Sequence, residues 1–196
     1  MKKIALSCLI WIATIASSLL LAKSMRIDSL AFGWAFNFLL MFWISIYVEF
    51  QTQDLNSTYF ASKDWEQRGK IYEWIGINLF RKFLVIIGWE RMNKKANPIE
   101  KNKQTLEHNL LRTKKSELGH LIIFVLVAIA SLAVIIDSGI KSALWLSLFN
   151  VLFNLYPVLL QRYNRPRIER ALRLINKNEE RERSKLKIQD RLHLES

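Results

Sequence analysis

The 196-residue chain contains a single cysteine, Cys8, which lies within an apolar run. One cysteine supports neither a disulfide framework nor a cysteine metal cluster. Only four residues of the apolar run precede it, which argues against a lipoprotein cysteine. The sequence therefore predicts no metal site and no bound cofactor.

Charge is missing from four long stretches, which are residues 4–22, 29–48, 121–136 and 142–161. A helix that crosses a bilayer needs about 20 mostly apolar residues. The third stretch is extended by Leu118, Gly119 and His120, and one neutral histidine near a helix end is tolerable there. We predict an all-α integral membrane protein with four transmembrane helices in two hairpins, a pattern that fits a soluble enzyme poorly.

The first apolar stretch also lacks the marks of a secretory signal. Its 19 residues exceed the usual signal core of about 7 to 15, and no small-x-small cleavage site follows. Another apolar stretch begins almost at once. We read residues 4–22 as a transmembrane helix.

The net charge of +12 would suggest a nucleic-acid partner in a soluble chain, but its distribution indicates topology instead. Four crossings place both termini and the middle segment on one side, which then carries 26 of the 29 basic residues. The positive-inside rule predicts that this side is cytoplasmic. We expect a multi-pass cell-membrane protein with both termini in the cytoplasm and no nucleic-acid partner.

Four segments follow from this pattern. Residues 1–50 form an N-terminal transmembrane hairpin, residues 51–117 a cytoplasmic or interfacial segment, residues 118–165 a second hairpin and residues 166–196 a basic cytoplasmic tail helix. The outer turns, "KSMRID" and "DSGIK", are short, and Gly139 can close a helix there. Any chemistry is then expected within the bilayer or on its cytoplasmic face.

Residues 71–89, "IYEWIGINLFRKFLVIIGW", are rich in Trp, Phe and Ile but carry Arg81 and Lys82. Placing both cations at mid-bilayer would cost about 5 to 7 kcal/mol on the insertion scale. We expect an interfacial amphipathic segment, with a re-entrant path as the alternative. It could serve as a surface anchor, or as a lid or floor for a lipid substrate.

The tail from Pro166 onward is highly charged and is predicted to be helical, because Ile168, Leu172 and Ile175 recur at helical spacing. Asn164 as a cap followed by a proline predicts a break between the fourth transmembrane helix and the tail helix. The charge itself is typical of a solvated face held near anionic lipid.

The fourth apolar stretch carries a polar stripe. Its members are spaced by three and four residues and so share one helix face, and they are Ser147, Asn150, Asn154, Pro157 and Gln161, with Arg165 continuing the line. Amides in hydrocarbon need partners, so this face must point inward. Interhelical hydrogen bonding and a substrate groove are both compatible with the stripe.

Thr113, Glu117 and His120 share one face where the chain enters the third transmembrane helix. A carboxylate one turn from an imidazole can fix its tautomer, as a general base requires. An ordinary helix-end contact is the alternative. Because the last two transmembrane helices are antiparallel neighbours, this pair is expected near the depth of a second polar group, which consists of Gln161, Arg162, Tyr163 and Asn164.

With these residues in view, the chain resembles the glycosyl-diaponeurosporenoate acyltransferases of the staphyloxanthin carotenoid pathway, from about residue 59 to residue 175. The resemblance rests on "FASKDWEQRGKIYEWIGINLFRK", "TKKSELGH" and "NLYPVLLQRYNRPR", and the last is the most specific. It implies transfer of a fatty acyl group to a sugar hydroxyl of a glycosylated carotenoid at the cell membrane. The implied partners are the bilayer, a lipid-like acceptor and an acyl donor such as acyl-coenzyme A as co-substrate.

Our hypothesis assigns His120 as the general base, oriented by Glu117. Arginines suit phosphates or an oxyanion, and those assigned to this role are Arg162, Arg165 and Arg167. The remaining substrate-binding candidates hold the sugar or line the polar groove, and they are Tyr163, Asn164, Asn154, Gln161 and Thr113. The competing hypothesis is a non-catalytic membrane protein whose motifs serve helix packing and lipid anchoring.

Overall fold

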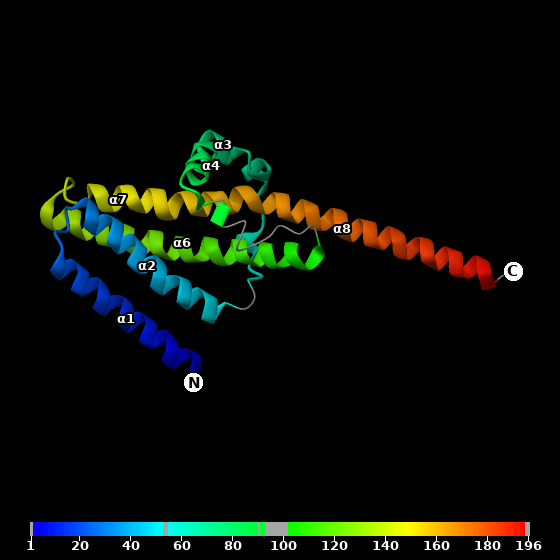
Figure 1. Ribbon diagram of the computed structural model, residues 1–196, viewed down its shortest axis with the longest axis horizontal. Coiled ribbons are helices and arrows are strands. Elements are labelled where there is room, and N and C mark those ends of the chain that lie inside the picture. Colours follow the sequence, from blue (N-terminus) through cyan, green and yellow to red (C-terminus); the bar gives the residue numbers. More distant parts are fainter. Residues whose placement is uncertain (1, 53–54, 90, 93–101, 195–196) are drawn as a thin grey trace.

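The computed structural model describes residues 2–52, 55–89, 91–92 and 102–194, and every regular element among them is helical. Among these residues, four helices are long and apolar enough to cross a membrane. They are α1 (Lys2–Ser24), α2 (Leu30–Gln51), α6 (Lys103–Ser138) and a continuous helical rod over Leu144–Gln189. This confirms the predicted all-α membrane architecture. The turns of both hairpins lie at the same end of the molecule (Figure 1).

Local sequence explains where these helices begin and end. The Ser29 side chain caps α2 by accepting a hydrogen bond from the Phe32 N–H at 3.1 Å. Asn102 caps α6 in the same way, accepting from the Thr105 N–H at 2.7 Å. Helix α6 ends at Gly139, whose φ of +83° is open to glycine but costly for other residues.

The central core lies between α2, α6 and α7 (Leu144–Asn150). Its buried hydrophobic side chains are Phe32, Leu40, Ile44, Val48, Ile123, Val127 and Leu146. Helix α1 packs against α2 and leaves most of its apolar side chains exposed, with Ile12 and Leu20 both 67 % exposed. Such exposure is expected of a helix that faces lipid.

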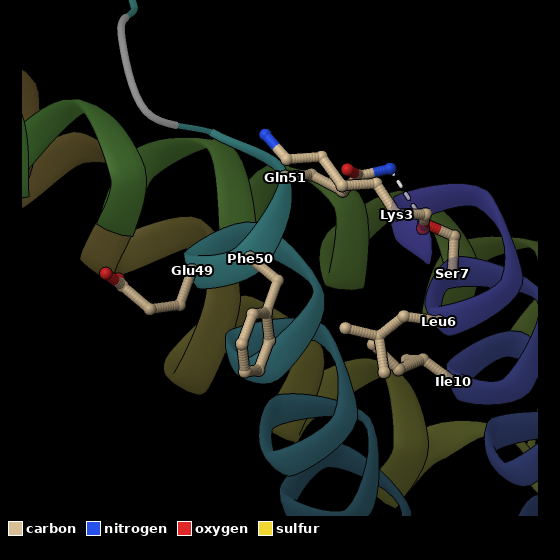
Figure 2. A pocket seen from close by; sticks show the side chains of 7 residues that line it. All are labelled: Lys3, Leu6, Ser7, Ile10, Glu49, Phe50 and Gln51. Carbon is tan, nitrogen blue, oxygen red and sulfur yellow. Dashed lines mark hydrogen bonds between the residues drawn. The ribbon is translucent and has the colours of Figure 1, made fainter. Parts of the chain in front are cut away.

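A cleft of about 210 Å³ separates α1 and α2 at the end of the pair that carries the N-terminus (Figure 2). Gln51 donates a hydrogen bond to the Ser7 hydroxyl across it, at 2.7 Å. The cleft is lined by Lys3, Leu6, Ser7, Ile10, Glu49, Phe50 and Gln51.

The last transmembrane rod departs from the predicted pattern in two ways. A π-helical turn, Val151–Leu155, joins α7 to α8 (Tyr156–Leu194), so the stripe spacing does not follow a regular α-helix. The predicted break at Pro166 is wrong, because α8 runs through it without interruption. Proline in a helix removes its own N–H donor and crowds the carbonyl four residues earlier, here that of Arg162, and α8 accommodates both effects.

The segment between the hairpins folds back onto α8. It contains the short turns η1 (Thr58–Phe60) and η2 (Asp64–Gly69), then α3 (Ile71–Trp74) and α4 (Ile77–Ile86). In Figure 1, α3 and α4 lie on the side of α8 away from α6. Their buried side chains Tyr72, Ile77 and Phe80 pack with Tyr163, whereas Trp74 and Ile86 are 90 % and 82 % exposed. At 10 residues, α4 is too short to span a bilayer.

The close approach of α2 to α7 gives a direct test of the packing. A Cβ added at Gly33 would lie 2.9 Å from the Trp145 backbone carbon, which cannot move away easily. Gly33→Ala should therefore reduce the free energy of unfolding by about 1 to 3 kcal/mol, the usual cost of overpacking. This loss is measured as a lower melting temperature of the detergent-solubilised protein.

Gly119→Ala is the matched control, because both glycines lie in helices and gain the same helix propensity. At Gly119 the nearest atom, Val48 Cγ2, would be an ordinary 3.9 Å away. Equal melting temperatures for the two variants would contradict the packing described here.

Candidate active site at the membrane boundary

Two arginines of α8 share one buried carboxylate of α6. Arg162 donates from Nε to Glu117 Oε1 at 2.8 Å, and Arg165 donates from Nη2 to Glu117 Oε2. The side chains of Glu117 and Arg165 are 0 % and 2 % exposed. Glu117 directly precedes one charge-free stretch and Arg162 directly follows another, which places the group at the membrane boundary.

A second carboxylate reaches this group from η2. Glu66 Oε1 accepts from Arg162 Nη1 at 2.7 Å and from the Tyr72 hydroxyl at 2.7 Å, and Glu66 Oε2 accepts from the Lys63 N–H at 2.8 Å. Two carboxylates thus balance two guanidiniums. We call these four residues, Glu66, Glu117, Arg162 and Arg165, the boundary network.

The titration of Glu66 and Tyr72 reflects this environment. Burial by itself would raise the pKa of Glu66, but hydrogen bonds from Tyr72, the Lys63 backbone and Arg162 outweigh it and hold the pKa below its usual value. The pKa of Tyr72 is raised, first by burial and then by its hydrogen bond to the Glu66 carboxylate. Glu66 is therefore held as an anion and Tyr72 as a neutral donor.

The segment η1 covers the two guanidiniums. Arg162 and Arg165 donate to the carbonyls of Tyr59 and Phe60 at 3.1 Å and 3.0 Å. Their guanidinium carbons lie 4.7 Å from the Tyr59 ring centroid and 5.5 Å from that of Phe60. Thr113 accepts a further hydrogen bond from Arg165 Nε at 3.3 Å. Both arginines are thereby oriented from several directions.

The backbone after Glu66 is strained. Gln67, Arg68 and Gly69 all have positive φ, at 49°, 57° and 90°. Only glycine adopts this region without a steric cost. Gly69 is also pressed against α8, since a Cβ there would lie 3.0 Å from the Tyr163 carbonyl oxygen. The turn is held in place by the contacts of Glu66 on one side and this close approach on the other.

A chain of amides lies deeper in the membrane. The NH₂ group of Asn37 donates to the Gly33 carbonyl, and that of Asn150 donates to the Phe124 carbonyl. Because backbone carbonyls only accept, these contacts fix the orientation of both amides. Their oxygens then accept from Asn154 Nδ2, at 2.7 Å and 2.9 Å. Asn37 and Asn154 are both 0 % exposed.

These hydrogen-bonded amides orient Asn154 toward the half-buried His120. Because Asn154 uses its NH₂ group on Asn37 and Asn150, its Oδ1 is the atom that faces His120 Nδ1, at 3.4 Å. An amide oxygen can only accept, so this contact favours the tautomer with the proton on Nδ1 and the lone pair on Nε2. That is the form in which a histidine acts as a general base through Nε2.

The predicted contact between Glu117 and His120 needs correction. Both oxygens of Glu117 are engaged by Arg162 and Arg165, and His120 instead contacts Asn154. The reason is electrostatic: a buried guanidinium needs a carboxylate, whereas a neutral imidazole is satisfied by an amide. The expected common depth holds for Glu117 with the arginines, while His120 lies at the level of Asn154.

The other sequence-predicted residues fall in three places. Gln161 donates to the Ser116 hydroxyl at 3.2 Å, and Asn164 is half-buried beside Arg165. Tyr163 and Arg167 lie on a different face of α8, with Glu73 of α3 and Arg81 of α4. Among the residues that the structure describes, no group of three potential metal ligands occurs.

Sequence reasoning assigned no role to Glu66, Asn37, Glu73 or Arg81. Glu66 and Glu73 stand in the stretch "DWEQRGKIYEW", so a buried carboxylate partner for the arginines could have been sought there. Asn37 is the one amide in its charge-free stretch, and that isolation was a usable signal.

Comparison with known proteins adds the chemistry. The sequence profile of the family glycosyl-4,4'-diaponeurosporenoate acyltransferase matches residues 56–174. The chain belongs to this family. The match encloses the whole boundary network together with His120 and Asn154, but it leaves out Asn37 and the first hairpin. No curated protein matches the chain, and no solved structure does. As a glycosyl-4,4'-diaponeurosporenoate acyltransferase family member, the protein is an acyltransferase-type membrane protein linked to carotenoid biosynthesis.

The boundary network predicts a large effect from removing one charge. Glu117→Ala leaves Arg165 buried without a carboxylate, which typically costs about 3 to 5 kcal/mol. We expect a clearly lower melting temperature and lower abundance in membranes. The double variant Glu117→Leu with Arg165→Leu removes the stranded charge and should recover much of the loss.

Glu49→Ala serves as the control, since Glu49 is 72 % exposed in its ion pair with Lys115 and should matter little. If Glu117→Ala proved as stable as Glu49→Ala in the same detergent, the network would not carry the stability assigned to it.

Proposed function

We propose that the protein transfers a fatty acyl group from an activated thioester, such as acyl-coenzyme A, to a hydroxyl of a glycosylated carotenoid acid at the cytoplasmic face of the cell membrane. Family membership supports the acyltransferase class. The observation that carries the mechanism is the contact of His120 with the oriented amide of Asn154, because it favours the tautomer in which Nε2 can accept a proton.

In this mechanism His120 is the general base. Its Nε2 removes the proton from the acceptor hydroxyl as the hydroxyl oxygen attacks the acyl carbonyl carbon. A C–O bond forms, the C–S bond of the thioester breaks, and the proton passes to the departing thiolate. Ester and free thiol are the products, so His120 returns to its neutral state and no cofactor is consumed.

The boundary network acts as a positioning element in this proposal. Arg162 and Arg165 join η1 and η2 to α6 and α8. In this proposal a donor and an acceptor approach His120 beside this junction. With two carboxylates already bound, these arginines carry little net charge toward a ligand. Glu117 contributes through Arg162 and Arg165 rather than through the imidazole. Thr113 and Gln161 lie at the same junction, where Thr113 accepts from Arg165 and Gln161 donates to Ser116.

Substitution of the base tests the function. In membranes supplied with palmitoyl-coenzyme A and a glycosylated carotenoid acid, His120→Ala should reduce the acylated product by about 10²- to 10⁴-fold, the usual contribution of general base catalysis. Mass spectrometry detects the product as a mass increase of one acyl unit.

His108→Ala is the matched control, because His108 is exposed near the start of α6 and should leave product formation unchanged. Unaltered product from His120→Ala would refute the assignment of the base. Absence of product from the unsubstituted protein under these conditions would favour the non-catalytic alternative, in which the polar residues serve packing and anchoring.

A further inference from the structure

The Tyr163 ring gathers two arginines on a face of α8 that the boundary network does not use. The guanidinium carbon of Arg167 lies 3.7 Å from the ring centroid, and that of Arg81 lies 5.4 Å from it. Arg81 Nη1 also donates to the Tyr163 hydroxyl at 3.3 Å. Arg81 comes from α4 and Arg167 from α8, and both are exposed. Solvent can therefore reach the two arginines, which contact the otherwise buried Tyr163 ring.

One carboxylate, Glu73 of α3, occupies the space between these donors. Its Oε1 accepts from the Tyr163 hydroxyl at 3.2 Å and lies 3.7 Å from Arg167 Nη2. The pair is loose, since Glu73 and Arg167 are 41 % and 48 % exposed. Among the described residues, Arg81 has no carboxylate partner, so the cluster of two guanidiniums and one carboxylate keeps a net positive charge.

The contrast with the boundary network is informative. There, two carboxylates neutralise two guanidiniums, and the side chains of Arg162 and Arg165 are only 11 % and 2 % exposed. Here, two exposed guanidiniums share one weakly held carboxylate. Guanidiniums with spare N–H donors and a phenol hydroxyl are suited to phosphate oxygens.

We propose that Arg81, Tyr163 and Arg167 form a phosphate-binding subsite, and that the Glu73 carboxylate is an internal competitor for it. The interpretation rests on the proposed function, which supplies two sources of phosphate: the nucleotide part of a coenzyme A thioester or the headgroup of an anionic phospholipid. Helix α4, which supplies Arg81, also exposes apolar side chains, Leu79 and Ile86 among them, and these suit contact with acyl chains.

Binding to the full-length protein in nanodiscs tests this subsite. In phosphatidylcholine nanodiscs, coenzyme A titrated by calorimetry should bind the unsubstituted protein. Arg81→Gln with Arg167→Gln should weaken binding by about ten- to hundredfold, as expected for the loss of charge-assisted hydrogen bonds. Glu73→Gln should instead strengthen it several-fold, because the competitor is gone.

Controls of equal charge change come from the exposed tail. Lys185→Gln with Lys187→Gln matches the double arginine variant, and Glu182→Gln matches Glu73→Gln. Both should bind coenzyme A as the unsubstituted protein does. A role of the cluster in fastening α3 to α8 alone predicts that Glu73→Gln weakens the fold and leaves binding unchanged or lower, which would overturn the proposal.

Phosphatidylglycerol in the nanodiscs separates the two sources. Coenzyme A binding that persists there supports the soluble donor. Binding that phosphatidylglycerol abolishes, together with retention of that lipid by the unsubstituted protein but not by the double arginine variant, supports the headgroup. If the arginine substitutions change the binding of neither coenzyme A nor phosphatidylglycerol, the proposed subsite is overturned. Continued acyl transfer by such a protein would leave the proposed function standing, whereas phosphate binding without any acyl transfer would contradict only the function.

Discussion

A guanidinium that is 2 % exposed at the edge of a bilayer requires a fixed negative partner, and in this protein that requirement organises the chain. Arg165 meets it with Glu117 of α6, and Arg162 meets it with Glu117 and with Glu66 of η2. The second carboxylate comes from a segment outside the transmembrane helices. The segment must therefore fold back onto α6 and α8. This path places Gln67 and Arg68 in the left-handed backbone region, which is sterically unfavourable for residues other than glycine. Fold and candidate site are thus joined by one set of ion pairs.

Three faces of the last rod carry three different tasks. Asn154 faces α2 and α6, where it contacts Asn37 and His120. Arg162 and Arg165 face α6 and the η1–η2 segment, which they join through hydrogen bonds and ion pairs. Tyr163 faces α3 and α4, where Arg81, Glu73 and Arg167 gather. The arginine-rich run that follows the apolar stretch is consequently divided between the boundary network and this second cluster.

The sequence predicts much of this arrangement because hydropathy and charge act over long windows. Four charge-free stretches define the spans, and antiparallel neighbours bring Glu117 near Arg162. What it could not predict depends on single contacts between distant segments. Glu66 was not assigned to the arginines, since the fold-back of η2 leaves no periodic trace. Pro166 suggested a break because a proline lacks the N–H donor of a helical residue, yet α8 continues through it. The π-turn at Asn154 shifts the helical register in a way that residue spacing does not reveal.

Thiol crosslinking in native membranes tests the central claim, that the boundary network clamps the middle segment onto α8. In a Cys8→Ser background, Ser62→Cys and Glu169→Cys replace side chains whose polar atoms lie 3.2 Å apart, and Ser7→Cys with Gln51→Cys provides a reference pair within the first hairpin. The account predicts that a short thiol crosslinker joins both pairs, and that Glu66→Ala abolishes the first crosslink while sparing the second. Unchanged crosslinking of residues 62 and 169 in Glu66→Ala would contradict it.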